Sequence, residues 1–180
     1  MRIIGGKFKG RRFQAPTNIK ARPTTDFARE GLFNLLMHRL ELSNAEVLDL
    51  FAGTGSLSFE FASRGAKRVI SIDKDSTSFA SIKKNAMAMD IDTVFCMRMD
   101  VLRYLKDRKD SFDIIFADPP YQLEVHEKVH QLIMENEFLR SDGLFILEHS
   151  EYTSFENLSG FIEQRQYGHV NFSFYKHTEE

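Results

Sequence analysis

Four aspartates at or near the ends of apolar runs constrain the fold of this 180-residue chain more than any other feature. They are Asp49, Asp73, Asp100 and Asp118. The apolar runs have strand length and alternate with amphipathic segments of helix length, which is typical of a parallel α/β sheet. The carboxyl ends of parallel strands share one edge of the sheet, where such folds bind ligands. We therefore expect a doubly wound, mostly parallel sheet of seven strands, with four carboxylates along one edge.

Periodicity places the individual elements. Strands are expected over residues 45–50, 69–73, 93–97, 114–117 and 143–148, followed by an antiparallel hairpin of strands 161–167 and 170–176. Helices are expected over residues 56–63, 76–89, 124–136 and 154–159. One further helix is expected after a cap among residues 24–26, and a short one after Val101. Residues 1–22 contain strand-like pieces separated by glycines. They predict a small basic β-extension to a domain that spans residues 23–180.

The segment Asp118-Pro119-Pro120-Tyr121 ends the fourth strand abruptly. Two prolines cannot continue a strand ladder, so they hold Asp118 and Tyr121 rigidly just beyond it. The Asp118 carboxylate and the Pro119 carbonyl can accept both N–H bonds of an exocyclic nucleobase amine, which leaves its lone pair aimed at an electrophile. Tyr121 offers a ring on which a base can stack. For this motif alone, an aspartate that caps a turn is the alternative.

A glycine turn, Phe51-Ala52-Gly53-Thr54-Gly55, joins the first strand to the next helix. Glycines let the backbone approach a ligand closely. Ser58 stands where the third glycine of a dinucleotide fingerprint would be, which argues against NAD or FAD. Asp73 can accept both hydroxyls of a ribose, as acidic residues do in Rossmann domains. The pattern favours a nucleoside cofactor other than a dinucleotide.

The net charge of −2 conceals an asymmetry, because residues 1–40 contain nine Lys and Arg against two acidic residues. This segregation predicts an anionic partner, for which nucleic acid is the commonest candidate. A solvated basic tail is the alternative. Two interpretations are open for the residues around the start of the following helix, which are Arg22, Thr24, Asp26 and Arg29. They either line a ligand or cap and solvate that helix.

Other features exclude several classes of protein. Cys96 is the only cysteine, so no intramolecular disulfide or cysteine-rich metal site can form, and we expect it in the core. The chain lacks a membrane-spanning run and its start lacks a signal-peptide region, which predicts a cytoplasmic protein. His126-Glu127-Lys128-Val129-His130 matches the zinc-peptidase pattern, with Glu148 or Glu151 as a conceivable third ligand. We favour an exposed polar helix face there and expect no metal.

The motif series resembles that of class I S-adenosylmethionine-dependent methyltransferases that modify amines. The segments that carry this resemblance are Asp49 to Gly55, Asp73, Asp100 and Asp118 to Tyr121. Further segments resemble, more specifically, the bacterial 16S rRNA guanine-N(2) methyltransferases of the RsmD family: Arg2-Ile3-Ile4-Gly5-Gly6-Lys7, Gly10-Arg11, Arg22-Pro23-Thr24 and Arg29 to Asn34. The resemblance covers nearly the whole chain. It departs at Asp73, where the family often has glutamate, and at Thr54 and Ser56, where it often has Ser and Ala.

The resemblance implies a role for each matching position. The guanine would be held by Asp118, Pro119, Pro120 and Tyr121. S-adenosylmethionine would be bound by Asp49, Phe51, Ala52, Gly53, Thr54, Gly55, Asp73, Lys74, Asp100, Val101 and Thr24. The RNA phosphates would be gripped by Arg2, Lys7, Lys9, Arg11, Arg12 and Arg22. The expected partner is 16S rRNA within the 30S subunit or a late assembly intermediate, bound by a monomer without membrane contact.

Other functions stay open on the sequence. A DNA adenine or cytosine amino-methyltransferase shares the Asp-Pro-Pro-Tyr motif, although 180 residues leave little room for a target-recognition region. A protein-glutamine methyltransferase has no evident use for the basic segment. A catalytically silent RNA-binding assembly factor could retain the same fold.

Overall fold

The computed structural model describes residues 1–16, 24–120 and 122–177. Twelve helices and strands are formed within them. The helices are α1 (Asp26–Arg39), α2 (Ser56–Ser63), α3 (Ser76–Ala88), α4 (Val101–Asp107) and α5 (Leu123–Glu135). The strands are β1 (Glu46–Leu50), β2 (Arg68–Asp73), β3 (Val94–Arg98), β4 (Phe112–Ala117), β5 (Leu139–Ser150), β6 (Phe161–Tyr167) and β7 (Val170–Tyr175).

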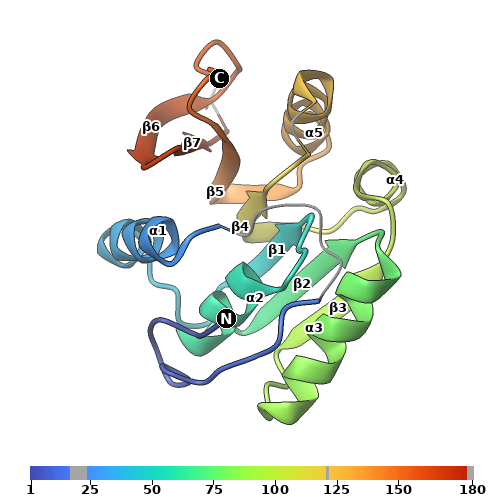
Figure 1. The fold of residues 1–180 in the computed structure, drawn as a ribbon. Helices are drawn as coiled ribbons and strands as arrows, with labels where there is room; N and C mark the ends of the chain where they lie inside the picture. The colour runs from blue at the N-terminus through green and yellow to red at the C-terminus, as the bar shows by residue number, and fades with distance from the viewer. Residues whose placement is uncertain (17–23, 121, 178–180) are drawn as a thin grey trace.

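All seven strands form one sheet in the order β3-β2-β1-β4-β5-β7-β6 (Figure 1). Strands β1 to β5 pair in parallel, whereas β7 pairs antiparallel with both β5 and β6. The chain reverses its direction of winding between β1 and β4, which makes their carboxyl ends the expected ligand site. The doubly wound fold with its C-terminal antiparallel hairpin is therefore confirmed.

The helices cover the two faces of the sheet, with α1, α2 and α3 on one side and α4 and α5 on the other (Figure 1). Each face has its own apolar cluster. Val47, Ile114 and Ile146 belong to the first cluster, and Leu48 and Ile115 belong to the second. Because successive side chains of a strand point to opposite faces, this division assigns every strand residue to a side.

The N-terminal segment packs on the side of α2 and α3. Ile3, Phe8 and Phe13 are buried in the first apolar cluster, so the segment is anchored at every fifth residue. The Lys7 amide donates to the carbonyl of Ser63, at the end of α2, at 2.6 Å. A single antiparallel bridge joins Arg2 to Arg12 and gives the segment the shape of an irregular hairpin.

Two predicted elements differ in the structure. Residues 154–159 form turns instead of a helix, because Phe155 is drawn into the second apolar cluster and its carbonyl accepts from the Tyr175 hydroxyl at 3.0 Å. Strand β5 begins at Leu139, four residues before the predicted start at Gly143. A Cβ at position 143 would lie 2.9 Å from the Arg140 carbonyl oxygen and 3.1 Å from that of Phe112, so this glycine allows a bulge inside the strand.

Candidate active site

The tips of β1 and β4 lie side by side at the carboxyl edge of the sheet. Leu50 pairs with Ala117, and the Asp118 amide donates to the Leu50 carbonyl at 3.3 Å. The glycine turn therefore leaves β1 next to the point where Asp118 and its prolines leave β4. Pro119 is buried and Pro120 is exposed. Tyr121, and with it the predicted base-stacking ring, lies outside the described residues.

The backbone of the glycine turn is held in left-handed conformations. The φ angle is 61° at Phe51, 52° at Gly53 and 76° at Gly55, which begins α2 as its N-cap. Among the residues that the structure describes, a Cβ at Gly53 would meet only the Phe51 carbonyl oxygen, at 3.7 Å, so their packing leaves that side of the turn open. A ligand can approach the backbone there. Buried Thr54 stabilises the turn by accepting from the Ser56 amide at 3.3 Å.

Asp73, at the end of β2, bonds directly to this turn. Its carboxylate accepts from the Gly53 amide at 2.8 Å and from the Asp75 amide at 2.8 Å. Lys74 follows it with an exposed side chain. Asp100 lies at the next strand end, where it caps α4 by accepting from the Arg103 amide at 3.1 Å. The structure brings these predicted cofactor residues to one edge, and their binding roles stay predictions.

Asp49 lies beneath the glycine turn and is almost completely buried. It accepts from the Ser58 hydroxyl, which lies 2.7 Å from the Ser71 hydroxyl on β2. Burial raises the pKa of Asp49 to about 7. The serine that replaces the third glycine of the dinucleotide pattern thus ties α2 to two strands.

Asp118 is partly buried at the tip of β4. Burial and, secondarily, the negative charge of Asp49 raise the pKa of Asp118 to about 7. Strand alternation places Phe116 and Asp118 on the α1 side of the sheet, as it does Asp49, which pairs with Phe116. The two carboxylates therefore lie on the same side of the sheet, where their negative charges repel each other.

The sequence analysis missed one carboxylate of this edge as part of the nucleoside site. Glu148 follows Leu147 in β5, keeps 6% of its surface exposed and accepts from the Thr24 hydroxyl at 2.8 Å. Burial and the charge of Asp118 raise the pKa of Glu148 well above its usual range. The signal was available, because Leu144 to Leu147 is another apolar run that ends in an acid. Thr24 was predicted to bind the cofactor, and in the structure its hydroxyl donates to this glutamate.

Arg29 is a structural residue, and its place differs from both alternatives left for it, because it neither lines the strand-end site nor solvates the helix. It is fully buried and donates to Glu60 at 3.1 Å and to Asp26 at 2.5 Å. Glu60 also accepts from the Ile4 amide at 2.7 Å and from Arg64. This network joins the N-terminal segment, α1 and α2.

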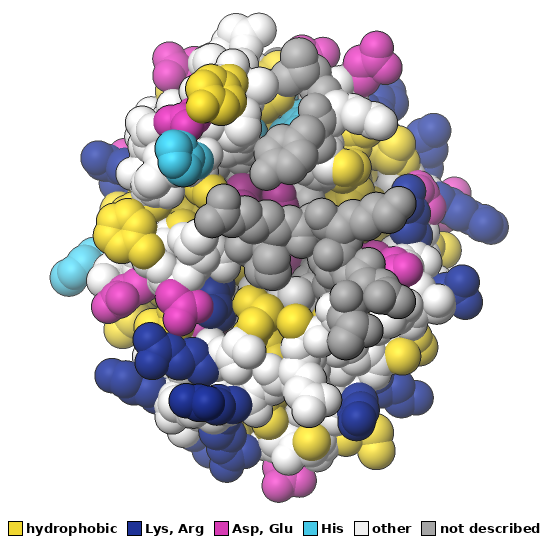
Figure 2. Space-filling view, in the orientation of Figure 1, with side chains coloured by type: hydrophobic (Ala, Val, Ile, Leu, Met, Phe, Trp, Pro, Cys, Tyr) yellow, Lys and Arg dark blue, Asp and Glu magenta, His cyan; other side chains and the backbone are white. Residues whose placement is uncertain are grey.

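The predicted RNA-binding residues of the N-terminal segment all have exposed side chains where they are described: Arg2, Lys7, Lys9, Arg11 and Arg12. Arg2 pairs with Asp26 at 3.2 Å, and Arg11 donates to the Met89 carbonyl at 2.5 Å. Figure 2 shows Lys and Arg side chains gathered at the lower left, over the region where this segment runs in Figure 1. Arg22 lies outside the described residues.

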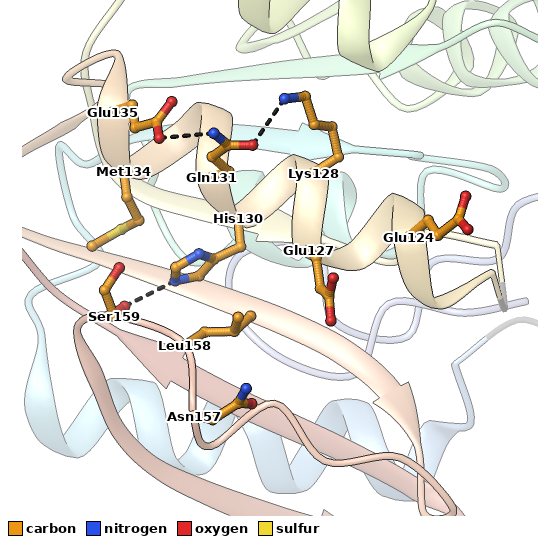
Figure 3. Close-up of a pocket in the computed structure, with 10 residues that line it drawn as sticks. All are labelled: Glu124, Glu127, Lys128, His130, Gln131, Met134, Glu135, Asn157, Leu158 and Ser159. Carbon is orange, nitrogen blue, oxygen red and sulfur yellow. Dashed lines mark hydrogen bonds between the residues drawn. The ribbon is translucent and has the colours of Figure 1, made fainter.

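The prediction of an exposed polar face for the two histidines of α5 was wrong. His126 stacks on Phe155 with ring centroids 5.0 Å apart. His130 bonds to the Ser159 carbonyl at 2.9 Å (Figure 3). Burial lowers the pKa of both. The loop after β5 covers this helix face, and periodicity within α5 cannot show that. His130 also borders a groove of about 450 Å³, which contains none of the strand-end carboxylates.

No group of three potential ligands that could hold a metal ion occurs among the described residues. Glu151, a conceivable third ligand, pairs instead with His169. In the same part of the chain, no helix is both long and apolar enough to cross a membrane.

Comparisons with known proteins agree with this geometry. The model of a family described as "Conserved hypothetical protein 95" matches residues 1–176. The Ribosomal RNA small subunit methyltransferase D of Haemophilus influenzae is 36% identical over 152 residues, which are 82% of this chain and 78% of that protein. Its Escherichia coli namesake is 32% identical over 82% of this chain and 74% of its own length. A structure described as "Putative methyltransferase yhhF from Escherichia coli" superimposes with a TM-score of 0.86 and 28% identity, covering 100% and 99% of the chains.

Proposed function

Because this chain belongs to the family "Conserved hypothetical protein 95" and has a class I methyltransferase fold, we propose that it transfers a methyl group from S-adenosylmethionine to 16S rRNA. The acceptor is the exocyclic 2-amine of one guanine, in the 30S subunit or a late assembly intermediate. The enzyme acts as a monomer in the cytoplasm. Residues 1–22 form an RNA-contacting extension of the methyltransferase domain at 23–180. One observation carries the proposal. The glycine turn follows β1 and Asp118 follows β4, and the ends of these two strands are neighbours at one edge of the sheet.

The residues at this edge fit the cofactor. When bound, S-adenosylmethionine supplies an activated methyl group on a sulfonium. The open side of Gly53 would admit its methionine part, with Phe51 to Gly55 around it. Asp73 would accept from the ribose hydroxyls, and Asp100, beside Val101, from the adenine amine. The positive end of the α2 dipole would favour the carboxylate of the cofactor's methionine part.

Asp118 and the Pro119 carbonyl would take the two N–H bonds of the guanine amine. This fixes the nitrogen lone pair toward the methyl carbon for direct in-line displacement. The amine becomes acidic as it is alkylated, so the Asp118 carboxylate need only orient it and receive the proton afterwards. Burial raises the pKa of the Cys96 thiol to about 12, so this side chain is unsuited to be a nucleophile. The target base must leave its stack to reach the edge.

The test is the variant Asp118→Ala with Asp142→Ala as matched control. Asp142 is exposed at the start of β5, at the opposite edge of the sheet. We expect Asp118→Ala to lower turnover by at least about a hundredfold, because the amine loses its orienting acceptor. Binding of S-adenosylmethionine, measured by calorimetry, should persist. Near-normal turnover in Asp118→Ala would refute the proposed role.

A second assay separates the competing functions. Labelled S-adenosylmethionine is offered with 30S subunits, naked 16S rRNA and duplex DNA, and the modified nucleoside is identified by mass spectrometry. N(2)-methylguanosine from either RNA substrate is the expected product. Label in duplex DNA would favour a DNA amino-methyltransferase, and RNA binding without label would favour a silent assembly factor.

A further inference from the structure

Glu148 is buried beside the tip that holds the target amine. Leu147 pairs in parallel with Ala117, so the next residues, Glu148 and Asp118, are neighbours across strands about 4.8 Å apart. Phe116 pairs with Ile146, and both lie in the apolar cluster of the α1 side. Strand alternation therefore gives Glu148 and Asp118 the same face. The Thr24 hydroxyl, just before α1, bonds to Glu148 from that face at 2.8 Å.

Within the part of the chain that the structure describes, Glu148 has no paired cation, unlike the other buried glutamate. Glu60 is paired with both Arg29 and Arg64, whereas no salt bridge among the described residues includes Glu148. The charge of Asp118 repels it, and this repulsion adds to burial in raising the pKa of Glu148. Such an uncompensated buried acid beside a proposed site is a candidate for ligand binding. A ligand with two adjacent N–H donors would satisfy both carboxylates.

The Watson–Crick edge of guanine supplies such donors, with the ring N1–H next to the 2-amine. We propose that Glu148 accepts the N1–H of the target guanine while Asp118 holds its 2-amine, so that Glu148 selects guanine. This inference rests on the function proposed above. Thr24 orients the glutamate by donating to one carboxylate oxygen. Hydrogen bonds from guanine's two N–H donors favour the ionised form and offset the burial that raises the pKa of Glu148, whereas adenine and 2-aminopurine carry an unprotonated N1 that offers this carboxylate no donor.

The test compares guanosine with 2-aminopurine riboside at the methylated position of ligated 16S rRNA, reconstituted into 30S particles where needed. Both bases have the 2-amine, but only guanine has the N1–H. We expect kcat/KM of the wild-type enzyme to favour guanine about 10- to 100-fold, the range for losing one hydrogen bond to a charged group. In Glu148→Gln, the amide oxygen keeps the Thr24 bond while the N–H2 group can donate to N1. The preference should fall at least about tenfold.

Each outcome decides a separate point. Failure of the wild-type enzyme to methylate guanine in rRNA would reject the proposed function itself. Methylation of guanine and 2-aminopurine with equal kcat/KM by the wild-type enzyme would overturn the Glu148 inference alone, whether or not the variant folds. An unchanged preference in a folded Glu148→Gln that binds S-adenosylmethionine normally would overturn it as well. A purely structural glutamate would lower kcat/KM for both bases equally and leave their ratio unchanged.

Discussion

The buried pair of Arg29 and Glu60 gives the sharpest test of how the N-terminal segment is held. Both side chains have no exposed surface, and their closest polar atoms are 3.1 Å apart. Glu60→Gln keeps the shape of the side chain, and its amide oxygen can still accept from the Ile4 amide. The substitution removes the charge that balances Arg29, whose other carboxylate partner, Asp26, is 51% exposed.

The expected loss follows from that burial. Breaking a buried ion pair from one side costs about 3–5 kcal/mol, because the remaining charge is left uncompensated. For a chain of this length, about 1 kcal/mol shifts Tm by about 2–4 °C, so we expect a fall of about 6–20 °C. Urea unfolding and calorimetry measure the free energy of unfolding and Tm. Trypsin should also cleave more readily at Lys7 and Lys9, since the charged network that joins the N-terminal segment to α1 and α2 is weakened.

Asp107→Asn is the matched control. Asp107 pairs with Arg103, and their side chains are 53% and 73% exposed, respectively. The substitution removes a carboxylate charge, as Glu60→Gln does. Exposed pairs four residues apart on a helix contribute about 0.3–0.5 kcal/mol. If Glu60→Gln cost no more than this control, the argument that the buried network anchors the segment would be wrong.

Three further predictions concern ligand binding. Gly53→Ala should weaken binding of S-adenosylmethionine in calorimetry at least about tenfold, because its Cβ would occupy the open side of the turn; Gly10→Ala, at a φ of 84° with open space around it, controls for backbone strain alone. The kcat/KM for rRNA should rise with pH through about 7, because Asp118 and Glu148 accept N–H bonds only as carboxylates, and burial raises the pKa of Asp118 to about 7 and that of Glu148 well above its usual range. Replacing exposed Lys9 and Arg12 by Gln should weaken rRNA binding and reduce the slope of log K against log salt by about 0.7–0.9 for each phosphate that the protein ceases to neutralise.

These predictions have distinct controls and contrary outcomes. Lys106→Gln with Lys109→Gln removes two exposed positive charges around the end of α4, away from the N-terminal segment, and should leave the salt slope unchanged. Equal slopes for the two double variants would remove the N-terminal segment from the RNA interface. A pH profile that is flat between about pH 5.5 and pH 8 would contradict the need for ionised Asp118. Unaltered cofactor affinity in Gly53→Ala would place the cofactor elsewhere.

Local patterns predicted much of the fold. Helix α2 and strand β6 have the bounds that the sequence pattern predicts, because glycines lie close to both ends of each element. The same patterns missed the turn-forming segment at 154–159 and the early start of β5. Both depend on contacts with distant residues, Tyr175 in the first case and Phe112 in the second.

Some features of the candidate site could likewise be predicted from local patterns, and others could not. The sequence placed Asp73 and Asp118 at strand ends, and the parallel sheet brings those ends to one edge. It left Arg29 undecided between ligand binding and capping, and it placed His126 on an exposed face. A single chain segment carries no information about which other element will cover it, so the burial of His126 and the ion pairs of Arg29 could not be predicted.

The sequence by itself determined the alternation of strands and helices, the glycine turn and the rigid Asp118 tip, because these depend on backbone preferences and apolar periodicity within a few residues. Only the tertiary structure decided that Thr24 bonds to Glu148, 124 positions away, and that Glu60 balances Arg29. Those pairings arise when helix α1 and the N-terminal segment pack against one face of the sheet. The shared burial then gives each carboxylate its partners and its charge environment.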